Sequence, residues 1–368
     1  MNSIEAQSGG AGDPLDPDQR AEIRASMGVA SEGDQRGQRD TIGFAVDAMQ
    51  MAACVDAASA PPRPIPLAGG ASGGESGPVL GAICPHDDYL YAGRVYRDVL
   101  AHVRAPLVVI IGVFHSYRRL GVRGRVGFEA YRSWRSPDGP IEVSALREAW
   151  RARLRPEDHF VSNACHDAEH SIEAIAYWLR HGRPDRTILP LLAPAERFDR
   201  ISELARRAGS ALGAVAIERG LLLGRDLAVV ISADAVHYGA DFEHTPFGDR
   251  GAAAHEAAVA RDLALLHDLS GEVTSAKVER FFEALVDPAE PDRYRIPWCG
   301  RFSIPFGLLL LRELRVALGQ PLPLAVPLVY GTSIDPPRLN VASARPGVTA
   351  PADEAHFVGH PGVLLVAP

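Results

Sequence analysis

From residue 78 onward, short apolar runs alternate with longer segments whose apolar residues recur at helical spacing. The short runs are rich in β-branched residues and end in Gly, Pro or polar residues, as buried strands do. The predicted strands are Val79–Cys84, Leu107–Gly112, Thr187–Leu192, Leu227–Ser232, Leu324–Tyr330 and Gly362–Val366. The predicted helices are Gly93–Val103, Ser144–Arg153, His170–His181, Phe198–Ala216, Ala252–Leu269, Val273–Leu285 and Gly307–Leu318. The alternation predicts an α/β fold with a mixed, mostly parallel central sheet and helices on both faces.

Residues 1–77 differ in character from the rest of the chain. The first residues, through Pro17, are rich in Gly, Ser, Asp and Pro, and residues 61–77 form a second stretch rich in Pro, Gly and Ser. Between them, Asp18–Met27 and Thr41–Ala58 have helical spacing. We therefore expect a flexible N-terminal extension with short helices over residues 1–77, without a role in chemistry, followed by one α/β domain over residues 78–368.

Composition narrows the class of protein. The chain is 46% hydrophobic and 23% charged, which is typical of a globular domain. Its net charge of −8 argues against nucleic-acid binding, and its apolar runs are far shorter than the roughly 20 residues that cross a bilayer. The four cysteines are widely spaced and form neither a CxxC pair nor a disulfide framework, so we expect a reducing, cytoplasmic location.

Polar residues with possible chemistry follow three of the predicted strands. His86 comes shortly after the first strand, His115 after the second, and Asp234 and His237 follow the strand at 227–232. The carboxyl ends of strands in open α/β sheets are where ligands bind, so these residues are site candidates. Each is alternatively an ordinary loop residue, with Asp234 capping a turn. An imidazole near an aspartate also suits acid/base work.

Two further stretches carry candidate residues. Cys299, followed by Gly300 and Arg301, precedes an apolar helix, a setting in which a nearby cation favours the thiolate that binds metals; otherwise the cysteine is simply a small buried residue. Residues 166–173 contain two histidines and three carboxylates, among them Glu169 and His170. These predict either contacts to a site or capping of a helix N-terminus. Tyr89 and Tyr91 follow His86 and either line a pocket or pack against it.

Taken in order, these stretches resemble the Memo-like family, protein B of the AmmeMemoRadiSam system. The matching segments are Pro85-His-x-x-Tyr-x-Tyr-x-Gly93, Gly112-x-x-His115, Glu169-His-Ser-Ile-Glu173, Ser232-x-Asp-x-x-His-x-Gly239, Cys299-Gly-Arg-x-x-Ile304 and Tyr330-x-x-Ser333. The resemblance covers residues 78–368 and departs from the family pattern at Asp87 and Asp88, where small residues are usual. It implies a fold similar to that of the class III extradiol dioxygenases of the LigB type.

The resemblance also implies a metal site and a function. It assigns the metal ligands to His86, His115 and Cys299, and the acid/base position to His237 beside Asp234. Two imidazoles and a thiolate suit iron, with copper or zinc as alternatives. The implied function is a non-haem iron oxidoreductase acting on a small, aromatic substrate. The alternatives are a metal- or peptide-binding module without catalysis and a zinc-dependent hydrolase.

The expected supporting residues and partners follow from the same resemblance. Glu169 and His170 would orient the metal ligands, while Tyr89, Tyr91 and Arg301 would contact the substrate. A radical SAM or AMMECR-type protein is the partner that the resemblance implies, in addition to the small-molecule substrate.

Overall fold

The structure, a computed structural model, describes residues 12–67, 77–341 and 346–368. Its centre is a run of four parallel, almost entirely buried strands in the spatial order β9-β4-β10-β3. Their bounds are β3 (Val79–Cys84), β4 (Leu107–Gly112), β9 (Thr187–Leu192) and β10 (Leu227–Ser232). All four agree with the predicted bounds, because each is a short β-branched or leucine-rich run that is buried on both faces.

The sheet continues on both sides of this parallel core. Beyond β3, β14 (His356–Val366) pairs antiparallel with both β3 and β13 (Leu324–Thr332), so the sheet is mixed as predicted. Across the described residues the sheet has 14 strands. The remaining short strands are β1 (Gln35–Arg36), β2 (Ile65–Pro66), β5 (Val126–Phe128), β6 (Ser133–Trp134), β7 (Ile141–Val143), β8 (His159–Val161), β11 (His237–Gly239) and β12 (Gly271–Glu272).

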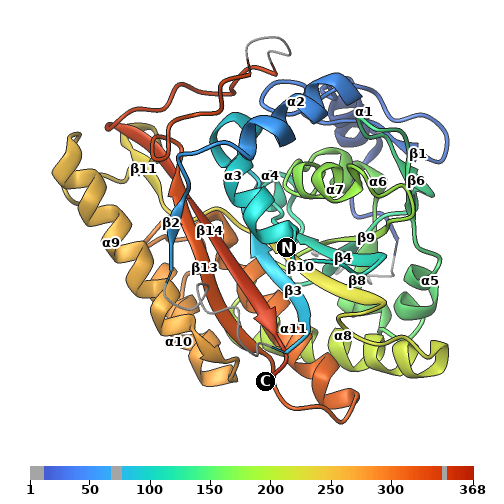
Figure 1. Cartoon of the computed structure of the whole chain (residues 1–368). Helices are drawn as coiled ribbons and strands as arrows, with labels where there is room; N and C mark the ends of the chain where they lie inside the picture. Colours follow the sequence, from blue (N-terminus) through green and yellow to red (C-terminus); the bar gives the residue numbers. More distant parts are fainter. Residues whose placement is uncertain (1–11, 68–76, 342–345) are drawn as a thin grey trace, which may run out of the picture.

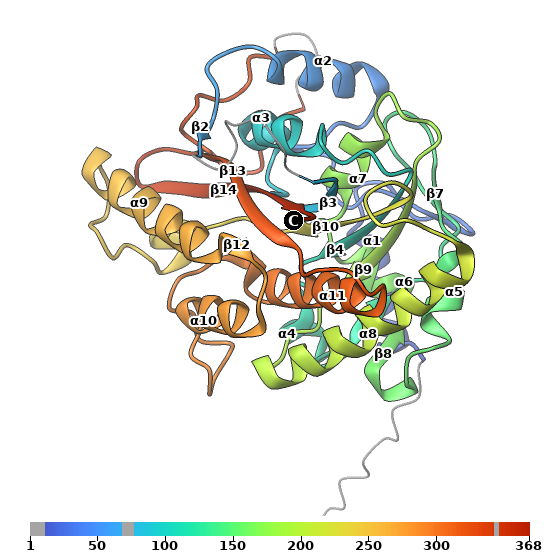
Figure 2. The ribbon, with the colours of Figure 1, turned by 60° about the horizontal axis from the view of Figure 1, so that its bottom comes forward.

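Helices cover the two faces of the sheet. On one side lie α2 (Ala48–Ala58), α3 (Tyr89–Leu100) and α7 (Glu173–Arg180), and on the other lie α8 (Phe198–Arg219) and α11 (Ser303–Ala317) (Figures 1 and 2). The other helices are α1 (Pro17–Ala25), α4 (Tyr117–Leu120), α5 (Leu146–Arg151), α6 (Asn163–Asp167), α9 (Ala252–Leu269) and α10 (Ser275–Leu285), with 3-10 turns η1 (Pro156–Asp158), η2 (Ala240–Phe242) and η3 (Cys299–Arg301). Within the described ranges, no helix has both the length and the apolar character that a bilayer span requires.

Among the predicted helices that begin later than expected, the two with the largest delays each have a local reason. The segment 41–58 is helical only from Ala48, because Asp47 caps the helix by accepting the Gln50 amide, while the preceding residues place Phe44 in the core. The predicted helix at 170–181 begins at Glu173, because the Glu169 carboxylate accepts the backbone amides of the next two residues and holds them in a loop.

The N-terminal segment packs against the central α/β body where the structure describes it. Residues 35–36 form β1 and pair with β6, and the Arg36 guanidinium is fully buried against the Glu173 carboxylate. A buried charge of this kind is tolerated only when its partner is present, so this segment is part of the folded unit. The described part of the predicted extension thus contacts the rest of the fold, and its flexibility stays a prediction, whereas residues 1–11 and 68–76 lie outside the described residues. The division into domains at residue 77 stays a prediction.

Candidate metal centre

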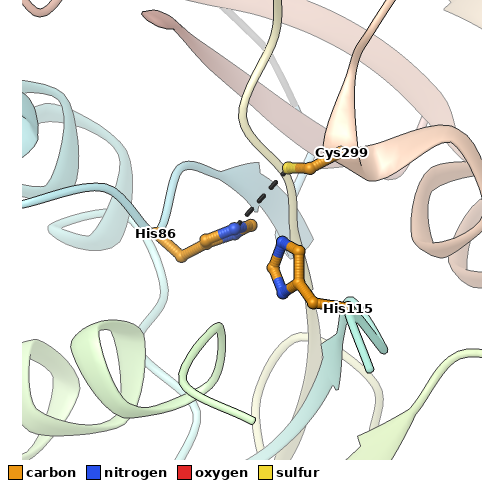
Figure 3. A group of neighbouring side chains, drawn as sticks. All are labelled: His86, His115 and Cys299. Carbon is orange, nitrogen blue, oxygen red and sulfur yellow. Dashed lines mark hydrogen bonds between the residues drawn. The ribbon is translucent and has the colours of Figure 1, made fainter. Parts of the chain in front are cut away.

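His86, Asp234 and His115 come together because β10 lies between β3 and β4. These three parallel strands end at the same edge of the sheet, so the residues that follow them share one place. Cys299 reaches this edge from η3, just before α11. Figure 3 shows the two imidazoles and the thiol directed toward one another, and one ligand atom from each lies within 4.8 Å of the others.

Two glycines permit this close approach. A Cβ atom on Gly112, at the end of β4, would lie 2.5 Å from the Ile172 side chain, so glycine lets the loop before α7 lie against the strand end. A Cβ atom on Gly300 would lie 2.4 Å from the Ala233 side chain. Glycine there allows the turn that carries Cys299 to contact the residue following β10.

The hydrogen bonds of His86 fix which ring nitrogen carries the proton. Its Nδ1 lies 2.8 Å from the Ser232 hydroxyl oxygen, and that hydroxyl donates its own hydrogen to the Ser171 carbonyl at 2.6 Å. The hydroxyl can therefore only accept from His86, so Nδ1 carries the hydrogen. The Nε2 lone pair is left free, 3.5 Å from the Cys299 sulfur.

The same logic holds for His115. Its Nδ1 lies 2.9 Å from a Glu169 carboxylate oxygen, and Glu169 also accepts the backbone amide of His115 at 2.7 Å. Burial by itself would raise the Glu169 pKa, but the charge and hydrogen bond of His115 hold that pKa well below its ordinary value. An ionised carboxylate only accepts, so His115 donates from Nδ1, and Nε2 is the ring nitrogen available to a metal.

The electron-rich atoms at the centre face one another. The Oδ2 atom of the Asp234 carboxylate lies 3.3 Å from Nε2 of His86. The Cys299 sulfur accepts a hydrogen bond from the backbone amide of Asp234 at 3.0 Å. Burial and the charge of Asp87 raise the Asp234 pKa to about 7, and burial with the charge of Asp234 raises the Cys299 pKa well above its ordinary value. Acceptor atoms at such distances require a proton or a cation between them. The residues thus fit a metal ion, which would also displace the thiol proton.

The sequence suggested that the Arg301 cation favours the Cys299 thiolate, and the structure does not agree. The Arg301 guanidinium contacts the Tyr117 and Tyr294 hydroxyls and the Phe302 ring instead of the thiol. Arg301 therefore does not act as the cation that would lower the Cys299 pKa. Within the described residues it is also not among those that line the cavity next to the centre, and its expected contact with substrate stays a prediction.

A cavity of about 300 Å³ opens beside two of the candidate ligands, His86 and His115. His86, His115, Asp234, His170 and His237 line it together with Tyr91, as the sequence suggested. The lining residues that the sequence did not point to are Phe44, Phe242, Thr349, Ala350, Ala352, His356 and Val358. Tyr89 is instead buried in the core, where its hydroxyl donates to the Ala174 carbonyl at 2.8 Å.

Two further histidines in this cavity differ in charge. His237 Nδ1 lies 3.1 Å from the carbonyls of Ala235 and Pro297, so it carries the hydrogen and leaves Nε2 as a base, and burial lowers the His237 pKa to about 4. For His170, burial alone would lower the pKa, but a 2.6 Å hydrogen bond to Asp40 and the charge of Glu169 raise it to about 9. Near neutral pH the cavity thus holds a neutral imidazole and an imidazolium.

The departures from the family pattern at Asp87 and Asp88 have structural roles. Asp87 lies 2.7 Å from Nε2 of the fully buried His360, and Asp88 accepts the Thr349 amide at 2.6 Å. Asp88 thereby ties the C-terminal segment to the start of α3. The sequence holds no local signal for this contact or for the pairing of Asp40 with His170, because the partners are far apart along the chain.

Fold and donor set together define an α/β protein with a candidate transition-metal centre at the carboxyl edge of its sheet. Residues 63–325 match the family model of the Memo-like proteins, and the chain belongs to this family. β14 lies outside the match but pairs with β3 inside it.

Curated relatives of the chain are members of the same family. The chain is 26% identical over 185 residues to a MEMO1 family protein of Pyrococcus furiosus, covering 48% of this chain and 59% of that protein. It is 30% identical over 164 residues to a MEMO1 family protein of Methanosarcina acetivorans, covering 44% and 55% of the two chains. The matched segment therefore spans little more than half the length of these relatives.

Proposed function

We propose that this chain is a metal-dependent oxidoreductase that acts on a small aromatic molecule, with the metal held by His86, His115 and Cys299. The observation that carries the proposal is the convergence of one nitrogen from each of the two imidazoles and one sulfur atom, all within 4.8 Å of one another. Each imidazole is held in the metal-binding tautomer by a hydrogen bond to its other nitrogen. Imidazole and thiolate donors suit iron, copper and zinc, and iron or copper would support oxidation.

A metal held by His86, His115 and Cys299 would supply electron exchange and Lewis acidity beside the cavity. The chain's own residues would do the rest. Phe44, Phe242 and Tyr91 give the cavity apolar walls suited to an aromatic ring. The neutral His237 would take up the proton of a phenol hydroxyl at Nε2, and the His170 imidazolium would attract the phenolate oxygen that results.

The test is the metal content of protein purified without oxygen, measured by plasma mass spectrometry for the wild type and for Cys299→Ala. We expect near-stoichiometric iron or copper in the wild type and its loss in the variant. Cys165→Ala is the matched control, because Cys165 is also a free, buried cysteine but belongs to none of the candidate ligand groups of the described residues. It should retain the metal.

A substrate assay follows from the same preparation. Oxygen uptake with catechols should depend on the metal and fall strongly in His237→Gln, which keeps the metal ligands. Zinc with no redox activity would favour hydrolysis instead, and tight metal binding without turnover would favour a binding module. Equal metal content in the wild type and Cys299→Ala would overturn the ligand assignment.

A further inference from the structure

A second polar cavity lies at the opposite edge of the sheet. It is bounded by the end of α3, the end of α7 and the residues just before β9, and its volume is about 400 Å³. Since β4 and β9 run from this edge toward the candidate metal centre, the cavity is separated from that centre by the length of the strands. Its lining residues are Val55, Arg97, Leu100, Ala101, Arg104, Trp178, Leu179, His181, Arg183 and Arg186.

Arg186 is the most unusual of these residues. It is only 6% exposed, and one of its terminal nitrogens donates to the Val103 carbonyl, but its buried Nε has no hydrogen-bond partner within the described residues. The adjacent carboxylate, Asp185, pairs with Arg183 instead. Burial and the charge of Arg183 lower the Arg186 pKa to about 10. A buried guanidinium without a counter-charge is costly, and an anion in the cavity would relieve that cost.

Three more arginines surround Arg186. The exposed Arg104 side chain makes no ion pair in the described part of the chain. Arg97 pairs with Asp98 and Arg183 with Asp185, in partly exposed ion pairs that are weak and readily exchanged for a stronger acceptor. His181 pairs with Asp138 at 2.9 Å. In a chain with a net charge of −8, this local excess of cations stands out against the overall charge.

Capping of helix ends accounts for only part of this arrangement. Cations near the carboxyl ends of α3 and α7 do interact favourably with the last carbonyl groups. The bond from Arg186 to the Val103 carbonyl is not such a contact, because Val103 lies beyond the end of α3, and it leaves Nε without an acceptor. The cavity also has an apolar wall: the Trp178 ring lies against Tyr96, with Leu100 and Val55 beside it.

We propose that this cavity binds a small phosphate monoester whose organic part is an aromatic or heterocyclic ring. Guanidinium groups match phosphate oxygens with paired hydrogen bonds, which explains the number of arginines. Trp178 and the neighbouring aliphatic side chains supply the surface on which a ring would lie. Four arginines around one cavity exceed what a single carboxylate requires, and the site needs no metal.

The test uses metal-free protein, so that phosphate cannot bind at the candidate metal centre. Phenyl phosphate and inorganic phosphate are titrated calorimetrically into the wild type, Arg104→Gln and Arg219→Gln. Arg219 is the matched control, because it too is an exposed arginine and it makes no ion pair within the described ranges. We expect saturable binding of phenyl phosphate, tighter than that of inorganic phosphate. Arg104→Gln should weaken it about tenfold and Arg219→Gln should leave it unchanged.

Arg186→Gln should abolish binding; if this variant does not fold, Arg183→Gln serves in its place, because that side chain is partly exposed. Binding should persist in Cys299→Ala, which separates this site from the candidate metal centre. The absence of saturable binding, or equal weakening in Arg104→Gln and Arg219→Gln, would overturn the proposal. Equal affinity for the two probes would overturn its aromatic part.

Discussion

Ser232 should control metal affinity without being a ligand. Its hydroxyl accepts from His86 Nδ1 and donates to the Ser171 carbonyl, so it fixes the imidazole in the tautomer that leaves Nε2 free. Ser232→Ala removes the hydrogen-bond acceptor that holds the proton on Nδ1 of His86. The proton can then move to Nε2, where it blocks metal binding. Removing such an orienting partner typically costs 10- to 100-fold in metal affinity, or about 1.4–2.8 kcal/mol.

The same substitution also costs stability, which must be separated from the effect on the metal. The buried Ser171 carbonyl loses its donor, so the free energy of unfolding of metal-free protein should fall by about 1–3 kcal/mol. Ser303→Ala is the matched control. Its buried hydroxyl donates to the Ser232 carbonyl at 2.7 Å, at the same end of β10, but does not contact His86. Its cost in stability should be similar.

The assay is a zinc titration against a competing chelator, because zinc does not oxidise the thiol. Unfolding in urea without metal, monitored by circular dichroism, gives the stability of each variant. Ser232→Ala should bind zinc at least tenfold more weakly than Ser303→Ala at similar stability. Equal affinities in the two variants would refute the assignment of Nε2 as the metal-binding atom of His86.

Two further predictions concern the folded unit around this site. Burial lowers the His166 pKa to about 3, so below the ordinary value of about 6.5 the unfolded chain binds a proton that the folded chain does not. The free energy of unfolding should therefore fall by about 2 kcal/mol from pH 7 to pH 5, and His166→Gln should remove that loss. The measurement is urea unfolding of both proteins at the two pH values, and an equal loss in both would contradict the prediction. Arg36→Ala leaves the Glu173 carboxylate buried without its partner and should cost about 3–5 kcal/mol, whereas a loss below about 1 kcal/mol would mean that the N-terminal segment contributes little.

Much of the fold follows from local pattern. The predicted bounds of β3, β4, β9, β10 and α9 agree with the structure, because their hydrophobic periodicity coincides with what the fold buries. The prediction failed where a polar side chain competes for backbone amides. Glu169 delays α7 in this way, and Asp47 fixes the start of α2. Such competition depends on where the side chain is directed, which periodicity does not encode.

The candidate metal centre could likewise be predicted from the sequence only in part. The sequence determined that histidines follow buried strands and that a cysteine precedes an apolar helix, since these are properties of short segments. Only the tertiary structure decided that β10 lies between β3 and β4, that His86 and His115 meet Cys299, and that Arg301 contacts Tyr117 instead of the thiol. The structure likewise decided the imidazole tautomers, because they depend on hydrogen bonds between residues distant in sequence. Strand order and these long-range contacts arise from packing the whole chain, so no local pattern contains them.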